Sequence, residues 1–409
     1  MNDFGLTRAP RAIVFGSGQR LALGRIAAQA GRTAFVCTDQ RLSAEPVFTA
    51  MMDDLKSNGV AVRVYDRTLA ELPLSCIDEA VRHASGFGPD LVIGIGGGSC
   101  MDLAKVVALL IGHGGHPRDY YGEFKVPAPV VPILAVPTTA GTGSEVTPVA
   151  VLGDPERAMK VGISSPHLIA HTAICDPELT FTCPPSLTAV SGADALTHAI
   201  EAFTAIVRPV TPALATDHVF VGKNTLSDAY GLQAIRLLSR FLPDAVGHGG
   251  NEAARVGVMQ GALLAGLAFG TAGTAAAHAI QYPVGALTHT PHGAGVAQLM
   301  PYVMAFNRSS CPAAMAEVAR AMGIKGAIGD QTEDVLSRAA VTAVADLFAS
   351  IGIPKTLAEL GLPADQIDWT AEQSLASQRL VKNNPRELDK AAMKSIIDAA
   401  FIGDLARLA

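Results

Sequence analysis

Hydrophobic and polar positions follow different patterns in the two parts of the chain, and the first part alternates short apolar runs with amphipathic stretches of helical period. The apolar runs are RAIVFG (11–16), TAFVCTD (33–39), VAVRVYD (60–66), DLVIGIGGG (90–98) and VPILAV (131–136). Strands that alternate with helices predict a mainly parallel sheet covered by helices on both faces. A sheet of this kind usually holds a nucleotide at the carboxyl ends of its strands.

From about Pro185 the strand signals end, and long helical segments rich in alanine and leucine follow. We expect helices over residues 189–205, 212–222, 228–241, 251–270, 295–306, 311–322, 332–351, 371–379 and 387–401. The pattern therefore predicts an α/β dinucleotide-binding domain over residues 1–184 and an all-α domain over residues 185–409. A small-molecule site is expected in the cleft between them. In the first domain, a hairpin is expected around Asp154 and Pro155.

The composition describes a compact globular protein and argues against several classes of partner. The 409 residues are 49% hydrophobic and 17% charged, with a formal net charge of −6 and dispersed lysines and arginines, so we expect no nucleic-acid partner. The chain lacks a recognisable secretory signal and an uninterrupted apolar span, so we expect a cytoplasmic protein that does not enter a membrane. Its 6 cysteines form no C-x-x-C pair, which favours neither a disulfide framework nor a thiolate zinc site.

The sequence GGGS over residues 96–99 ends the fourth apolar run and precedes a helix expected over residues 100–111. Glycines such as Gly97 and Gly98 let a pyrophosphate approach the backbone, and the N–H groups of the first helical turn attract its charge. Ser99 is the expected N-cap of that helix. The alternative interpretation is a strand-to-helix turn that only needs glycine.

Further polar residues follow neighbouring strands of the predicted sheet. Asp39 stands where an acidic side chain accepts hydrogen bonds from the ribose hydroxyls of adenosine, and it would repel a 2′-phosphate, which favours NAD over NADP. Thr138, Thr139 and Thr142 lie in a flexible loop suited to phosphate and ribose contacts. From its spacing alone, Lys160 is predicted to be a solvated surface lysine.

Two pairs of possible metal ligands lie in the helical part. Asp194 and His198 are four residues apart in a predicted helix, so they stand on one face of it. His278 and His292 are separated by a loop-like run with glycine and proline. One carboxylate and three imidazoles suit divalent iron or zinc better than calcium or magnesium, which prefer oxygen ligands. The alternative for each histidine taken singly is an ordinary surface or core position.

Several longer motifs occur in order along the chain. They are FGSGQRL, GGGSCMDLAK, PTTAGTGSEVT, ICDPELT, GADALTHAIEAF, NTLSDAYGLQAI, the block from His278 to His292 that ends in PHGAG, and NNPRE. With these motifs the chain resembles the iron-containing (group III) alcohol dehydrogenases over nearly its full length. The resemblance implies a Rossmann-like NAD(P) domain, a helical domain that holds one divalent metal, usually iron, and a homodimer.

The resemblance also assigns roles to particular residues. It implies the metal ligands Asp194, His198, His278 and His292. It implies cofactor contacts at Asp39, the turn from Gly98 to Asp102, the loop from Thr139 to Gly143, and Lys160. For Lys160, the resemblance favours a cofactor contact over a solvated surface position.

The chain departs from the family pattern at two places. Tyr282 stands where many members have a second histidine, four residues after the first of its block, and Asp66 and Arg67 replace a common Asn-Pro. Tyr282 or His289 is a candidate for proton relay to water. A tyrosine at this position also resembles the hydroxyacid-oxoacid transhydrogenase branch, which keeps NAD bound.

The expected activity is reversible hydride transfer between a primary alcohol and its aldehyde, with NAD(H) as partner and the metal as Lewis acid. The alternatives are a transhydrogenase with retained NAD, a metal-free reductase of the maleylacetate type, an enzyme of the dehydroquinate synthase type, and a non-catalytic nucleotide- or metal-binding protein. The intact set of four ligands and the long motif match favour the dehydrogenase. The sequence does not name the alcohol.

Overall fold

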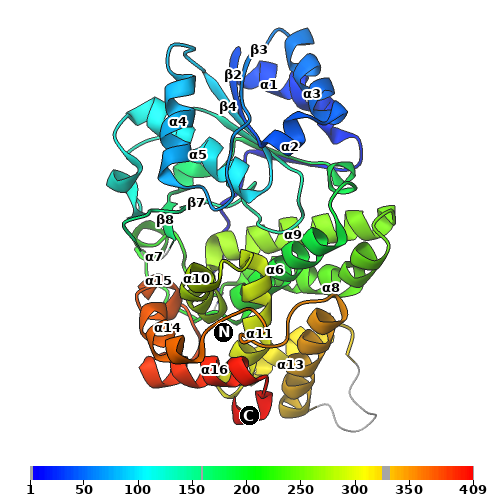
Figure 1. Ribbon diagram of the computed structural model, residues 1–409, viewed down its shortest axis with the longest axis vertical. Helices are drawn as coiled ribbons and strands as arrows, with labels where there is room; N and C mark the ends of the chain where they lie inside the picture. The colour runs from blue at the N-terminus through cyan, green and yellow to red at the C-terminus, as the bar shows by residue number, and fades with distance from the viewer. Residues whose placement is uncertain (1–2, 158–159, 325–331, 409) are drawn as a thin grey trace. The chain divides into compact units, whose positions relative to one another are not determined.

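The computed structural model describes residues 3–157, 160–324 and 332–408, and the chain forms two compact units. The α/β unit comprises Arg8–Thr182 and Thr216–Val219, and the helical unit comprises Met1–Thr7, Cys183–Ala215 and Phe220–Ala409. The predicted combination of a parallel α/β part and an all-helical part is confirmed (Figure 1).

The α/β unit is built on a six-stranded parallel sheet with the strand order β1-β9-β6-β4-β2-β3. Its strands are β1 (Ala12–Phe15), β2 (Thr33–Cys37), β3 (Ala61–Tyr65), β4 (Leu91–Gly96), β6 (Ile133–Pro137) and β9 (Thr172–Cys175). The five strands expected from the apolar runs are confirmed, whereas the sequence did not single out β9. Because β2, β4 and β6 are neighbours and parallel, the loops that follow them leave the sheet at the same edge.

Both faces of the sheet are buried along its inner strands β2, β4, β6 and β9, which explains why these strands are apolar at successive positions. Phe35 and Cys37 point into one core with α4 (Leu74–Ala84) and α5 (Gly98–His113). Ala34 and Val36 point into a second core on the other face. There α1 (Leu23–Ala30) and α3 (Pro46–Ser57) cover the sheet, and Figure 1 shows the two helix pairs on opposite sides of the strands.

A small three-stranded sheet completes the α/β unit, with the order β5-β8-β7. The predicted hairpin is confirmed, because β7 (Val149–Leu152) and β8 (Val161–Ser164) pair antiparallel. The short strand β5 (Gly122–Glu123) pairs parallel with β8 on its other side. Asp154 in the turn is buried and accepts two hydrogen bonds from Arg118, of 2.9 and 2.7 Å.

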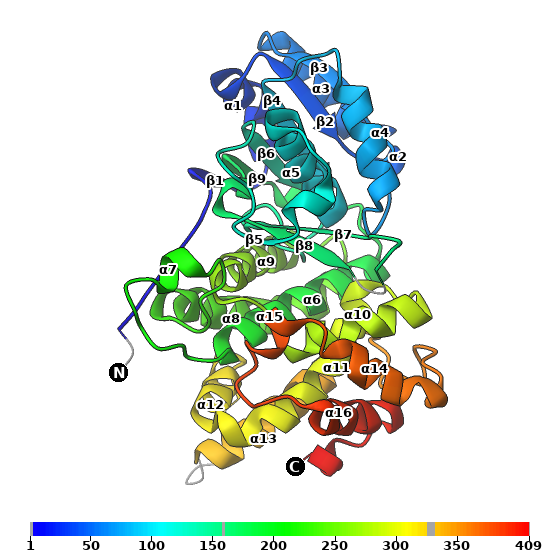
Figure 2. The same cartoon turned by 90° about the vertical axis from the view of Figure 1, so that its left-hand side faces the viewer.

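The helical unit consists of long helices around an apolar core. The helices that follow the sheet are α6 (Pro185–Thr204), α7 (Leu214–Asp217), α8 (Thr225–Gly247), α9 (Glu252–Ala272), α10 (Ala276–Thr288), α11 (His292–Asn307), α12 (Pro312–Ala321), α13 (Glu333–Ser350), α14 (Ile367–Ser374), α15 (Gln378–Val381) and α16 (Lys390–Ile402). Helices α6, α8 and α9 pack against one another, and α14 and α16 lie side by side in both views (Figures 1 and 2). Helix α9 is long and apolar enough to cross a membrane, but 78% of its most apolar window is buried in the structure, as in the core helix of a folded domain.

Four sequence predictions of local structure were wrong. Only Leu214–Asp217 of the expected helix 212–222 is helical, because prolines precede it and Gly222 adopts a φ of 79° in a bridge with Val207. The helix expected over 371–379 is split into α14 and α15, and the N–H of Gln378 instead bonds to the carbonyl of Ala376. The run between His278 and His292, expected to be loop-like, is mostly the helix α10, which accommodates Pro283 within its length. The fourth wrong prediction concerns the N-cap of α5, in the candidate cofactor site.

Candidate metal centre and cofactor site

Helix α6 carries the first pair of predicted ligands on a buried face. Asp194 and His198 are 4% and 5% exposed, and His198 Nε2 lies 3.7 Å from Asp194 Oδ1. This closeness follows from the four-residue spacing, since residues i and i+4 are neighbours on a helix. The first pair is therefore brought together as predicted.

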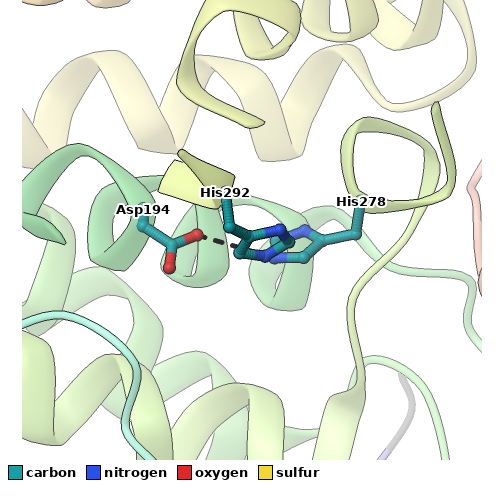
Figure 3. A group of neighbouring side chains, drawn as sticks. All are labelled: Asp194, His278 and His292. Atoms are coloured by element: carbon teal, nitrogen blue, oxygen red, sulfur yellow. Dashed lines mark ion pairs between the residues drawn. The ribbon is translucent and has the colours of Figure 1, made fainter. Parts of the chain in front are cut away.

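The second pair joins the first at the starts of two other helices. His278 lies in the first turn of α10 and His292 is the first residue of α11. His278 Nε2 lies 3.7 Å from Asp194 Oδ1, and one ligand atom each of Asp194, His278 and His292 lie within 4.8 Å of one another (Figure 3). Gly293 permits this approach, because a Cβ there would lie 2.3 Å from the carbonyl oxygen of Val190.

His198 lies beside this group of three. Its ring stacks on that of His278 with centroids 4.7 Å apart, and on that of Phe269 at 4.1 Å. The structure therefore gathers all four predicted ligands in one cluster of the helical unit, in which Asp194, His198 and His278 are buried and His292 is half-buried.

Glu201 belongs to this cluster, although the sequence reasoning did not identify it. Its carboxylate is buried, and its Oε2 lies 2.6 Å from Nδ1 of His278. Glu201 follows His198 by three residues and Asp194 by seven, so all three share one face of α6. The signal was present in GADALTHAIEAF as a third acidic or imidazole side chain at helical spacing.

The donor set fits a divalent transition metal. Among the described residues, none provides a hydrogen-bond partner for the buried Nε2 of His278. A buried nitrogen that carries a lone pair and faces a carboxylate and further imidazoles is typical of a site for iron or zinc. Calcium and magnesium would be poorly served by three nitrogen ligands.

Tyr282 lies one turn after His278 on α10, beside the cluster. Its ring is 6.1 Å from that of His292 with an interplanar angle of 22°. His289, the second relay candidate, is exposed at the C-cap of α10 with a φ of 55°. The structure therefore places Tyr282, but not His289, in ring contact with a predicted ligand.

The predicted phosphate site lies where β4 meets α5 in the α/β unit. Gly97, not Ser99, is the N-cap of α5, and Ser99 lies inside the first turn, so the N-cap prediction was wrong. The reason is that Gly97 itself adopts the extended backbone of a cap and the helix starts at Gly98. Within the described part of the chain, no side chain caps this helix, so its first N–H groups are open to an anion.

The hydroxyl loop after β6 packs directly on this turn. A Cβ on Gly98 would lie 2.8 Å from the side chain of Thr142, and one on Gly97 would lie 3.6 Å from Thr139. The N–H of Thr138 bonds to the carbonyl of Gly96 at 3.0 Å. Gly98 is thus needed for the close approach of the two segments, whereas a Cβ at Gly97 would make only an ordinary contact. Backbone without side chains at these two positions would admit a phosphate group.

Asp39 ends β2 at the same edge of the sheet. It is the N-cap of the short helix α2 (Gln40–Ser43), where its Oδ1 accepts the N–H of Leu42 at 2.9 Å. Its Oδ2 lies 3.9 Å from Cys100 Sγ. Burial raises the pKa of the Cys100 thiol to about 12, so this cysteine stays protonated and unreactive near neutral pH.

Lys105 is a second residue that the sequence reasoning missed. This fully buried side chain donates through Nζ to Ser144 Oγ at 2.9 Å and to the carbonyls of Thr147 at 3.0 Å and Val149 at 2.8 Å. Burial lowers its pKa to about 8, while the nearby Asp102 carboxylate opposes that shift. Lys105 therefore ties α5 to the end of the hydroxyl loop.

Asp102 and Lys160 are the remaining predicted cofactor residues. Asp102 accepts hydrogen bonds from Ser144 Oγ at 2.6 Å and from the N–H of Val151 at 3.0 Å. Burial raises the pKa of its carboxyl group, and the charges of Lys105 and Lys160 oppose this. Lys160 Nζ forms an ion pair of 3.2 Å with Glu71, so it is not a freely solvated lysine.

Comparisons with known proteins agree with this arrangement. A family model described as iron-containing alcohol dehydrogenase matches residues 10–177, and one described as the C-terminal part of the Fe-containing alcohol dehydrogenase family matches residues 188–401. The chain is 37% identical over 373 residues to long-chain-alcohol dehydrogenase 1 of Geobacillus thermodenitrificans (strain NG80-2), and the match covers 90% of each protein.

Two solved structures are similar over nearly the whole chain. A crystal structure of 1,3-propanediol oxidoreductase has a TM-score of 0.90 and 30% identity, covering 98% of this chain and 100% of that one. Sulfoacetaldehyde reductase from Bifidobacterium kashiwanohense, solved in complex with NAD+, has a TM-score of 0.82 and 27% identity, covering 97% of this chain and 98% of that one. The chain therefore belongs to the iron-containing alcohol dehydrogenase family, and it is a metal-dependent, NAD(P)-linked oxidoreductase that interconverts a primary alcohol and its aldehyde.

Proposed function

We propose that Asp194, His198, His278 and His292 hold one divalent iron ion and that this ion is the alcohol-binding centre of the enzyme. The observation that carries the proposal is the cluster in which ligand atoms of buried Asp194 and His278 and of half-buried His292 lie within 4.8 Å of one another. Zinc would fit the same donors, and family membership favours iron.

We further propose that the open edge of the parallel sheet binds NAD. The uncapped N-terminus of α5 and the narrow backbone at Gly97 and Gly98 bind the pyrophosphate. Asp39 accepts hydrogen bonds from the adenosine ribose and repels a 2′-phosphate, which favours NAD over NADP. Contacts from Ser99, Asp102, Thr138, Thr139, Thr142 and Lys160 complete the proposed cofactor site.

The protein's own groups then orient the reactants and manage charge. When bound, the ion supplies Lewis acidity towards the substrate oxygen, and the nicotinamide accepts or returns the hydride. Asp194 contributes the negative charge that offsets a divalent cation among neutral imidazoles. The hydroxyl of Tyr282, beside His292, is the proposed group for passing the alcohol proton towards water.

Further proposals concern the location, the oligomeric state, the substrate and the domain division of the protein. We infer a cytoplasmic homodimer that acts on a small alcohol or aldehyde. We also infer two domains divided at residues 184 and 185. Limited proteolysis and sedimentation of the purified protein would test the domain division and the oligomeric state.

A substrate panel tests the proposed activity directly. The metal-free protein is reconstituted with Fe(II) or with Zn(II) and assayed with alcohols, hydroxyacids and aldehydes against NAD and NADP. Alcohol-dependent formation of NADH, strongest with Fe(II), is expected. A protein that binds metal and NAD but oxidises no alcohol would contradict the proposal.

The same panel separates the second candidate, a transhydrogenase with retained NAD, which the tyrosine at position 282 brings into consideration. In that case, oxidation of a hydroxyacid would depend on an added 2-oxoacid, and free NAD would not be consumed.

A further inference from the structure

Glu201 is a buried carboxylate with three hydrogen-bonding neighbours. Its Oε1 accepts the N–H of Ala277 at 2.7 Å, and its Oε2 accepts the N–H of Ala275 at 2.9 Å. The same Oε2 lies 2.6 Å from Nδ1 of His278. The side chain is 1% exposed, so water does not compete for these bonds.

These contacts determine which nitrogen of His278 carries the proton. A carboxylate only accepts hydrogen bonds, and the short contact to Nδ1 therefore requires a proton on Nδ1. In the neutral imidazole the lone pair is then on Nε2, the atom that lies 3.7 Å from Asp194 Oδ1. The bond at Nδ1 also fixes the orientation of the ring.

We propose that Glu201 is a positioning residue of the metal centre, which holds His278 in the tautomer and orientation that present Nε2 to a divalent cation. The proposal rests on the proposed metal site, and it adds a residue that acts through His278 rather than on the substrate. A carboxylate behind a histidine ligand raises the basicity of the imidazole and strengthens its bond to a metal.

Glu201 also links the metal centre to the start of a helix. Ala275 is the N-cap of α10, and Ala277 and His278 lie in its first turn, where backbone N–H groups have no partner within the helix. The carboxylate satisfies two of these groups, and the positive end of the helix dipole attracts it. One side chain thus fixes both the backbone that carries His278 and the ring itself.

The substitution Glu201→Gln keeps the shape of the side chain but leaves only one acceptor oxygen. If that oxygen takes the place of Oε2, the amide NH2 faces the N–H of Ala277; if the amide is reversed, the NH2 faces Nδ1 of His278 and favours the wrong tautomer. We expect the dissociation constant for Zn(II) or Co(II) to rise about 10- to 100-fold. Competition with a chromophoric chelator measures it on the metal-free protein, and the visible absorption of the Co(II) form should shift.

A matched control comes from a half-buried carboxylate of the same unit. Asp228 pairs with Lys223 at 2.7 Å and is not one of the four proposed ligands. Asp228→Asn should lower the free energy of unfolding but leave the affinity for Zn(II) unchanged. Wild-type metal affinity in Glu201→Gln would overturn the proposal, as would an equal loss in Asp228→Asn.

A measurement on the wild-type protein keeps the proposal testable if Glu201→Gln does not fold. The imidazole ¹⁵N shifts of the metal-free protein, assigned for His278 with His278→Asn, should show a proton on Nδ1 and a bare Nε2. A proton on Nε2 would overturn the proposal. Metal affinity and tautomer are both read without substrate, so a wild-type protein that fails to oxidise alcohols would contradict the proposed function and leave Glu201 in its role.

Discussion

Two buried polar clusters, one in each unit, are satisfied in opposite ways. In the α/β unit, the ammonium of Lys105 donates three hydrogen bonds of 3.0 Å or shorter to the protein, and Asp102 accepts two more. In the helical unit, Nε2 of His278 faces Asp194 Oδ1 at 3.7 Å and has no hydrogen-bond partner among the described residues. Buried polar groups are nearly always paired within a protein, so the second arrangement indicates a place for an external cation. The first already has these hydrogen bonds within the protein, and Lys105 joins α5 to Ser144 and Val149.

The open cluster is the group of Asp194, His198, His278 and His292 in the helical unit. Removal of one of its ligands should have the largest effect on activity. His278→Ala takes away the nitrogen that the cluster presents, so the protein should lose its metal and its turnover together. We expect kcat/KM for the aldehyde to fall at least about 10³-fold, because Lewis acid stabilisation contributes several kcal/mol. Metal content by mass spectrometry and NADH titration by fluorescence check the result, with NADH binding expected to persist. A metal-free variant that retains activity would contradict the assignment.

The closed cluster is the group of Lys105, Asp102 and Ser144 in the α/β unit. Removal of the Lys105 cation should lower the stability of the protein instead of its activity. Lys105→Met leaves Asp102 buried beside an apolar side chain, and the free energy of unfolding should fall by about 3–5 kcal/mol. Denaturant titration followed by a probe in the α/β unit measures it. The double variant Lys105→Met with Asp102→Asn is the control, because it removes the uncompensated charge and should recover part of the loss. No recovery would mean that the hydrogen bonds of Lys105, and not its charge balance, stabilise the loop.

The two clusters also differ in how well the sequence predicts them. Asp194 and His198 share a helix, so helical period alone placed them together. Pro291 does precede α11 as its N-cap, but Pro283 and Gly285 lie inside α10, so the glycine and proline of the run between His278 and His292 did not mark a loop. The pairing of these two segments depends on tertiary packing; the residue types suggested a common metal site, and the family resemblance strengthened that prediction. Lys105 was missed because its partners are mostly backbone carbonyls of a loop, which leave no residue pattern. The Ser99 cap was wrong for a related reason, since the choice between Gly97 and Ser99 depends on backbone angles that glycine leaves open.

A third carboxyl group offers a milder test of the closed cluster. Glu145 is 4% exposed, and burial raises its pKa from an ordinary 4.5 to about 7, with Lys105 opposing the shift. Between pH 4.5 and 7, the folded state therefore keeps a proton on Glu145 that the unfolded state releases. The contribution of this neutral carboxyl group to the free energy of unfolding is complete below pH 4.5 and is lost as the pH rises through 7. Relative to Glu145→Gln, which mimics the neutral acid, the wild-type protein should lose roughly 1–3 kcal/mol of unfolding free energy between pH 4.5 and 7. Parallel pH profiles of the two proteins would contradict this.

Asp39 combines features of both clusters, because one of its oxygens accepts a hydrogen bond from the protein and the other lies near the protonated thiol of Cys100. Oδ1 caps α2 through the N–H of Leu42, while Oδ2 lies 3.9 Å from Cys100 Sγ. Asparagine caps helices as well as aspartate does, so Asp39→Asn should remove the charge and keep the local fold. We expect the preference for NAD over NADP, measured as the ratio of the two kcat/KM values, to fall roughly tenfold, because the repulsion of a 2′-phosphate is lost. An unchanged ratio at an unchanged melting temperature would show that the second oxygen is spare, and that Asp39 belongs with the closed cluster as a structural cap.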